Sequence, residues 1–65
     1  MRITLNGDAR DIAAANLDQA LSELGYTDSF VATAVNGHFV PKAERRNKRL
    51  DEGDRIEVVA PMQGG

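Results

Sequence analysis

The chain has no cysteine and no tryptophan, and its 65 residues include one histidine, one tyrosine and two phenylalanines. The lack of cysteine excludes disulfides and thiol chemistry and is compatible with a reducing cytoplasm. One histidine, His38, without any cysteine makes a structural zinc site a poor hypothesis. A Ser-His-Asp catalytic set is equally poorly supported, because so small a chain leaves little room for a pocket around that histidine.

Long hydrophobic runs are also missing, and none is long enough to span a bilayer. Met1 leads directly into a strand-like segment, so we expect no signal peptide and a cytoplasmic location. The formal net charge of −2 gives no overall attraction to nucleic acid or anionic lipid. An apolar fraction of 42% and a charged fraction of 28% are ordinary for a globular protein. We expect one domain over residues 1–65, near the lower size limit for a single core.

The first twelve residues predict a hairpin. Arg2–Leu5 alternates polar and apolar residues, which is the period of a half-buried strand. Asn6-Gly7 follows, and this pair tolerates the positive φ angles of a two-residue type I′ turn. We therefore expect a second, weaker strand over residues 9–12.

A helix is predicted after this hairpin. Apolar residues recur at i, i+3, i+4 and i+7, which places them on one helical face: Leu17, Ala20, Leu21 and Leu24. Asn16 is a good N-cap, and Gln19 three residues later can complete a capping box. Gly25 is placed to end the helix in the left-handed conformation. The predicted helix covers residues 17–24.

The second Asn-Gly pair, Asn36-Gly37, predicts a second hairpin. It joins an apolar, β-branched run over residues 30–35 to a short strand over 38–40, which Pro41 ends. The pattern leaves open which set of alternating side chains faces inward in the longer strand. Residues 42–49 are polar and basic and suit a loop or one helical turn.

A last alternating run over residues 55–60 predicts a closing strand that points Ile56, Val58 and Ala60 to one side. The element order predicts an α+β fold in which one helix covers one face of a small sheet. The expected core is Ile3, Leu5, Ile12, Leu17, Leu21, Leu24, Leu50, Ile56 and Val58.

The other face of the sheet should then be open to solvent. Thr4, Glu57 and Val59 point there if the strand phases hold. Val59, together with Met62 beyond the strand, is a candidate contact for a partner protein. Scattered exposed apolar residues are also normal on any protein surface.

Gly64 and Gly65 close the sequence after Pro61, where no turn requires a left-handed bend. Terminal residues also fray without any function. Glycines, however, can lie extended in a narrow channel that a side chain would block. Residues 61–65 can reach about 17 Å beyond the domain when fully extended. We expect residues 61–65 to form a flexible tail that hands its terminal carboxylate to an enzyme.

Three motifs carry a resemblance to a known family. They are Val35-Asn36-Gly37 with Val40-Pro41-Lys42, the run LDEGDRIEVV over residues 50–59, and Gly64-Gly65. Together they resemble the sulfur-carrier proteins of thiamine biosynthesis over essentially the whole chain. The resemblance implies a ubiquitin-like β-grasp fold with a small mixed sheet. Many members have an arginine after Val-Pro and an aromatic residue a few positions later, whereas this chain has Lys42 and Arg45.

The resemblance also implies a chemistry. In that family an adenylating enzyme uses ATP to join the carboxyl group of the last glycine, here Gly65, to AMP, and Gly64 gives the tail access. A sulfur donor protein converts the adenylate to a thiocarboxylate, and thiazole synthase takes the sulfur. The carrier is then a substrate rather than an enzyme and holds no cofactor. Two alternatives use the same terminus: a molybdopterin-synthase-type carrier, whose chains tend to be longer, and a ubiquitin-like protein modifier.

Residues 42–49 carry five positive charges against one negative charge. Solvated surface is the first interpretation of such a run. In a second interpretation, Lys42, Arg45 and Arg46 meet an acidic patch on a partner enzyme. A third is a non-covalent protein- or RNA-binding module, although Phe39 is the one aromatic residue nearby, which disfavours nucleic acid.

Overall fold

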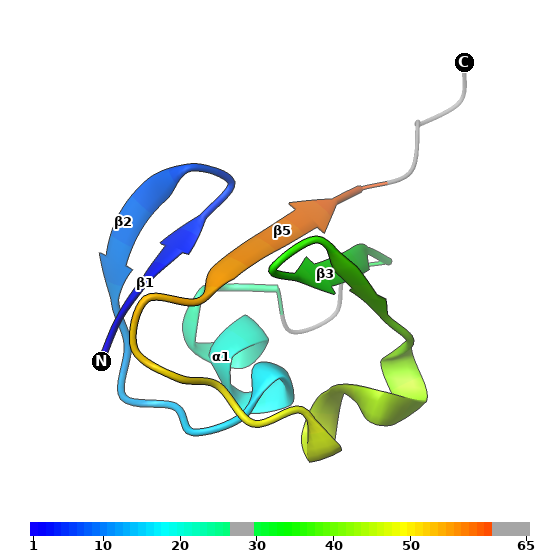
Figure 1. Cartoon of the computed structure of the whole chain (residues 1–65). Coiled ribbons are helices and arrows are strands. Elements are labelled where there is room, and N and C mark those ends of the chain that lie inside the picture. The colour runs from blue at the N-terminus through cyan, green and yellow to red at the C-terminus, as the bar shows by residue number, and fades with distance from the viewer. Residues whose placement is uncertain (27–29, 61–65) are drawn as a thin grey trace.

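The computed structural model describes residues 1–26 and 30–60. Within these residues the order is β1 Arg2–Leu5, β2 Asp8–Asp11, α1 Leu17–Glu23, β3 Ala32–Val35, β4 His38–Val40, the 3₁₀ helix η1 Lys42–Asn47 and β5 Arg55–Val59 (Figure 1). The strands form one mixed sheet in the order β2-β1-β5-β3-β4. β1 and β5 are parallel, and the other neighbouring pairs are antiparallel. The last strand therefore lies in the middle of the sheet.

Both Asn-Gly pairs form the predicted two-residue turns. The φ angles are 49° at Asn6 and 90° at Gly7, and 53° at Asn36 and 83° at Gly37. Two consecutive positive φ angles are typical of a type I′ turn. Because the first turn has only two residues, Leu5 pairs with Asp8, and β2 begins one residue earlier than predicted.

Helix α1 begins as the sequence predicts. The Asn16 side chain accepts a hydrogen bond of 2.8 Å from the Gln19 N–H. The prediction that Gln19 completes a capping box is wrong. Gln19 Oε1 accepts from the Ala15 N–H, at 3.5 Å, rather than from the N–H of the N-cap residue. The helix ends at Glu23, and Gly25 follows with a φ of 97°.

β3 begins at Ala32, two residues later than predicted. Ala32 pairs with Val59, the last residue of β5, so the residues before it have no partner strand on that side. Thr33 and Val35 face inward, which answers the question that the alternating pattern leaves open.

The core lies between the sheet and the helices. Eight of the nine predicted core residues are buried, whereas Leu24 is half-buried at the rim. The buried hydrophobic residues that the prediction lacked are Ala14, Ala20, Val35 and Val40. Ala60 is exposed and follows the end of β5, so its predicted inward position is wrong.

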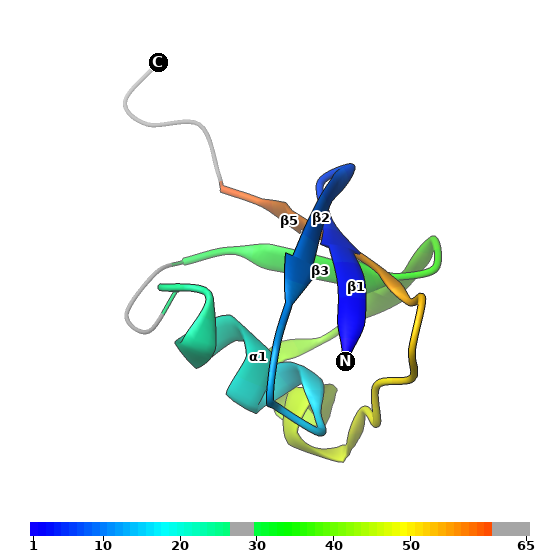
Figure 2. The ribbon, with the colours of Figure 1, turned by 90° about the vertical axis from the view of Figure 1, so that its left-hand side faces the viewer.

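α1 and η1 lie together on one side of the sheet (Figure 2). The prediction of one covering helix is therefore incomplete, because residues 42–47 add a short 3₁₀ helix to the same layer. The outer face of the sheet carries no helix among the described residues (Figure 2). Any partner that approaches the end of β5 from this side meets the sheet directly.

Candidate functional site

The end of β5 is the described part of the chain that leads to Gly64-Gly65. Val59 is its last residue; it lies on the outer face of the sheet and is 63% exposed. The predicted tail, with Met62, Gly64 and Gly65, lies outside the described residues. The site can therefore be built from the structure up to residue 60.

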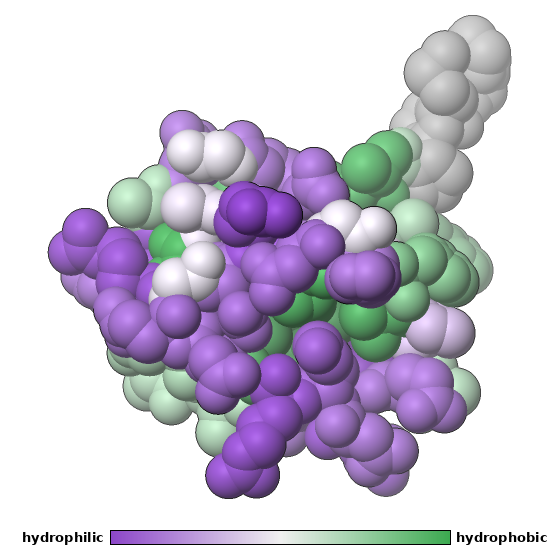
Figure 3. Space-filling model, in the orientation of Figure 1, coloured by the Kyte–Doolittle hydropathy of each residue, from purple (hydrophilic) through white to green (hydrophobic). Residues whose placement is uncertain are grey.

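Apolar side chains gather beside this strand end. Phe30, Val31, Ala32 and Val59 line an open hollow of about 320 Å³, which we call the tail-side surface. Phe30 is 87% exposed. Figure 3 shows hydrophobic residues gathered beside the end of β5, whereas much of the rest of that view is hydrophilic. Contiguous exposed apolar side chains are typical of contact surfaces.

The end of β5 is held from both sides. On one side β3 pairs with it up to Val59. On the other side β1 has already ended at Leu5, and the chain continues through Asn6. The Asn6 N–H donates to the Ile56 carbonyl at 2.9 Å. Asn6 Nδ2 then donates to the Val58 carbonyl at 3.1 Å, and Asn6 Oδ1 accepts from the Val58 N–H at 2.9 Å. No pattern in the sequence indicates this side-chain contact.

Arg45 is an internal residue and not part of a solvated surface. It is 8% exposed; its Nη2 donates to the Val31 carbonyl at 2.7 Å and its Nε to Thr33 Oγ1 at 3.1 Å. Thr33 Oγ1 in turn donates to the Val40 carbonyl at 2.9 Å. The interpretation of Arg45 as solvated surface is wrong, and little of this side chain is available to contact a partner. It ties η1 to the backbone beneath the tail-side surface.

The neighbouring cations remain on the surface. Lys42 and Arg46 are exposed and line an open hollow with Asp18 on the helix side of the molecule. Within residues 1–26 and 30–60 there is one ion pair. It joins Arg2 Nε to Asp11 Oδ1, at 2.9 Å, in the β1–β2 hairpin. The structure thus separates an apolar surface at the end of β5 from a basic surface on η1.

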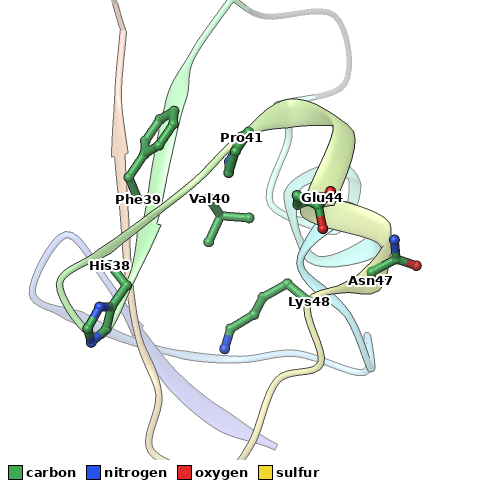
Figure 4. A pocket seen from close by; sticks show the side chains of 7 residues that line it. All are labelled: His38, Phe39, Val40, Pro41, Glu44, Asn47 and Lys48. Atoms are coloured by element: carbon green, nitrogen blue, oxygen red, sulfur yellow. The ribbon is translucent and has the colours of Figure 1, made fainter.

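A further hollow of about 290 Å³ lies between β4 and η1 (Figure 4). It is lined by His38, Phe39, Val40, Pro41, Glu44, Asn47 and Lys48. The Lys48 side chain extends toward Val40 and His38, whereas Phe39 points away (Figure 4). The lining combines the apolar side chains of Val40 and Pro41 with the polar or charged side chains of His38, Glu44 and Lys48.

Asp54 is a titratable group with a structural task in the turn before β5. Burial acts to raise its pKa, but hydrogen bonds from Asn36 Nδ2 and the Asp51 N–H, together with the charge of Lys48, outweigh it, and the pKa lies below its ordinary value. In the described part of the chain, no three histidine or carboxylate side chains are grouped to hold a metal ion. None of the helices described there combines the length and apolar character that crossing a membrane requires.

Comparison with known proteins matches the chain to one family. The model of the ThiS family matches residues 3–65. The chain is 36% identical over 63 residues to the sulfur carrier protein ThiS of Thermus thermophilus, and this match covers 97% of the chain and 98% of the relative. It is 33% identical over 66 residues to a thiazole synthase of Paramagnetospirillum magneticum, where it covers the whole of this chain but spans only 20% of that protein.

Solved structures agree with this match. The crystal structure of the thiamine biosynthesis protein (ThiS) from Geobacter metallireducens has a TM-score of 0.83 at 26% identity, with both chains fully covered. The NMR solution structure from the same organism has a TM-score of 0.79, with 88% of that chain covered. These likenesses confirm the ubiquitin-like β-grasp fold. With a family model that matches residues 3–65 and a relative similar along almost its full length, the chain belongs to the ThiS family.

Proposed function

We propose that this chain is a sulfur carrier in thiamine biosynthesis and that the carboxyl group of Gly65 carries the sulfur. The main support is the match to the ThiS family, which runs through Gly64 to Gly65. The relative of nearly equal length that is named a sulfur carrier adds to it. The similar segment within a thiazole synthase supports a functional link with that enzyme.

The proposed chemistry takes place at one carboxylate. A carboxylate oxygen of Gly65 attacks the α-phosphorus of ATP in an adenylating enzyme, and pyrophosphate leaves. Sulfur from a donor protein, at the oxidation level of sulfide, then attacks the acyl carbon and AMP leaves, which gives a thiocarboxylate. Thiazole synthase accepts the sulfur. The ATP is bound by the partner enzyme, so in this proposal the carrier needs no cofactor of its own. The carrier acts as a substrate, and we place the reaction in the cytoplasm.

Gly64 is proposed to give the tail access to the active sites of these enzymes. A residue without Cβ fits a channel just wide enough for backbone. Gly64→Val should therefore block adenylation, and the melting temperature should be unchanged because residue 64 lies beyond the last strand of the fold.

The tail-side surface is proposed to dock the adenylating enzyme, with Val59 and Met62 as contacts. An enzyme that holds residues 61–65 must meet the domain where β5 ends. There it finds the exposed side chains of Phe30 and Val59 beside an open hollow. Burial of such apolar area is the main source of favourable binding energy in protein contacts.

Lys42 and Arg46 are proposed to increase the rate of encounter with an acidic partner surface. Both lie exposed on η1, away from the tail-side surface. Charges at the rim of an interface change association rates more than affinity, and salt screens them. The double variant Lys42→Gln/Arg46→Gln should slow association at low salt and behave like the wild type at high salt.

The decisive experiment incubates the chain with its adenylating enzyme, ATP and a sulfide source. Intact-protein mass spectrometry should find a mass increase equal to the replacement of one oxygen by sulfur, located at Gly65 by fragmentation. A variant that lacks Gly65 is the matched control and should gain no sulfur. An unchanged mass of the wild type, with an enzyme that is active on another carrier, would contradict the proposal.

Further assays on the same chain separate the alternatives. Transfer of the sulfur to a molybdopterin precursor instead of to thiazole synthase would favour the molybdopterin-type carrier. A tail joined to lysine residues of other proteins would indicate a protein modifier. A non-covalent protein- or RNA-binding module would retain its binding without Gly64-Gly65.

A further inference from the structure

We infer that Asn6 is a positioning residue for the activation of this carrier: its side chain holds the end of β5 in place, so that Val59 and the segment after it meet the adenylating enzyme in one arrangement. This inference rests on the proposed function and assigns to it a residue 59 positions from the reacting carboxyl group. The evidence is the hydrogen bonding of Val58.

β5 is longer than the part of it that β1 covers. The parallel ladder pairs Thr4 with Arg55 and Leu5 with Ile56, and then β1 ends. The Val58 side chain is buried, and the backbone N–H and C=O of this residue face the side that β1 no longer covers. Both hydrogen bonds are partly buried: the amide of Asn6 supplies a donor and an acceptor, at 3.1 and 2.9 Å, to backbone groups that are partly withdrawn from water and need partners.

The turn conformation makes this contact possible. Asn6 has a φ of 49°, which turns the chain away from β1 and leaves the side chain beside β5. Asparagine is one of the few residues besides glycine that adopt this conformation readily. Among those residues, its amide offers both a donor and an acceptor, as a backbone peptide does. The side chain of Asn6 thus extends the sheet by one position.

Asn36 provides an internal comparison. It occupies the same place in the second Asn-Gly turn, with a φ of 53°. Its Oδ1 accepts from the Arg55 N–H at 2.9 Å, and its Nδ2 donates to Asp54 Oδ1 at 3.0 Å. The two turns contact opposite ends of β5: Asn36 bonds to Arg55, its first residue, and Asn6 bonds to Val58, near its last. Asn36 therefore holds the start of β5, and Asn6 holds the end from which the tail departs.

This difference predicts different effects on activation. Without the Asn6 side chain, β3 alone holds β5 beyond Ile56, so the end of β5 should leave its attached position in the sheet for part of the time. If only the attached form docks, the apparent dissociation constant rises in inverse proportion to the attached fraction. If the attached fraction falls to between about one third and one tenth, KM for the carrier should rise about 3- to 10-fold. kcat should stay unchanged, because the bound carrier is in the attached form.

The test compares Asn6→Gly with Asn36→Gly. Glycine keeps the positive φ angle of both turns and removes only the side-chain contacts. Pyrophosphate release by the adenylating enzyme gives KM and kcat, and hydrogen exchange of the Val58 amide reports the local contact. Asn6→Gly should raise KM about 3- to 10-fold and accelerate Val58 exchange, whereas Asn36→Gly should keep both close to wild type.

Asn6→Asp is a second variant for the case that Asn6→Gly folds poorly. It keeps an acceptor for the Val58 N–H but places an oxygen opposite the Val58 carbonyl, so it should also raise KM. A wild-type KM in a folded Asn6 variant, or an equal rise in Asn36→Gly, would overturn the inference. No activation of the wild-type carrier would instead contradict the proposed function, so the two failures are distinguishable.

Discussion

The two faces of β5 come from one five-residue stretch and have opposite environments. Ile56 and Val58 are buried against the helices, at 0% and 7% exposure, whereas Val59 is 63% exposed on the outer face. Strand alternation decides which side chains share a face. The position of α1 and η1 on one side of the sheet decides which face of β5 is closed (Figure 2). This strand therefore stabilises the domain with one face and presents exposed side chains to solvent with the other.

The largest effect on the free energy of unfolding is expected from a substitution on the closed face of β5. Ile56→Ala leaves a cavity where the wild-type side chain is fully buried. It should lower the free energy of unfolding by about 2–5 kcal/mol. Urea denaturation measures this, and an unchanged m-value would show that the unfolding reaction is the same. A loss as small as that of an exposed substitution would contradict the assignment of the closed face.

A smaller loss is expected at the contact between η1 and the start of β3. Arg45→Met keeps an apolar stem but removes the donors to the Val31 carbonyl and Thr33 Oγ1. An unpaired buried acceptor should cost about 1–3 kcal/mol in urea denaturation. The adjacent, exposed Arg46 is the matched control, and Arg46→Met should stay within about 0.5 kcal/mol of wild type. Equal effects of the two variants would mean that the buried contacts of Arg45 contribute nothing.

The turn that leads into β5 should make the free energy of unfolding depend on pH. The pKa of Asp54 in the folded chain lies below its ordinary value, so this carboxylate stabilises the fold at pH values above its unfolded pKa, roughly 4. The contribution is lost as the pH falls through the lower, folded pKa. Asp54→Asn should therefore be less stable than wild type at pH 7, and the difference should shrink in acid. Urea denaturation at several pH values tests this, and a constant difference would contradict it.

The smallest effect on stability is expected from the open face. Val59→Ser should change the free energy of unfolding by no more than about 0.5 kcal/mol, because the side chain is largely exposed. The same variant should raise KM for adenylation if the tail-side surface docks the enzyme. A stability loss near that of Ile56→Ala would break the comparison between the two faces. An unchanged KM would remove Val59 from the proposed docking contacts.

Much of the fold could be predicted because its signals are local. Asn-Gly pairs at 6–7 and 36–37 set the two turns through their tolerance of positive φ angles. Asn16 and the apolar spacing that follows it define α1. The pattern could not tell which alternate residues of β3 face inward, since Thr33 is polar and Ala34 apolar and yet Thr33 is the buried one. A buried hydroxyl is tolerated there because it is paired with Arg45 and the Val40 carbonyl.

Local sequence signals specify the two turns, the amphipathic helix and the alternation of β5, and the family motifs that end in Gly64-Gly65 are read directly from the sequence. These depend on neighbours within a few residues, where backbone preferences and side-chain spacing act directly. The inward turn of Arg45 and the contact between the Asn6 side chain and Val58 of β5 arise only once the chain has folded. Those contacts join residues 12 to 52 positions apart, and nothing in the local pattern specifies which distant backbone groups will lack a partner once the sheet has formed.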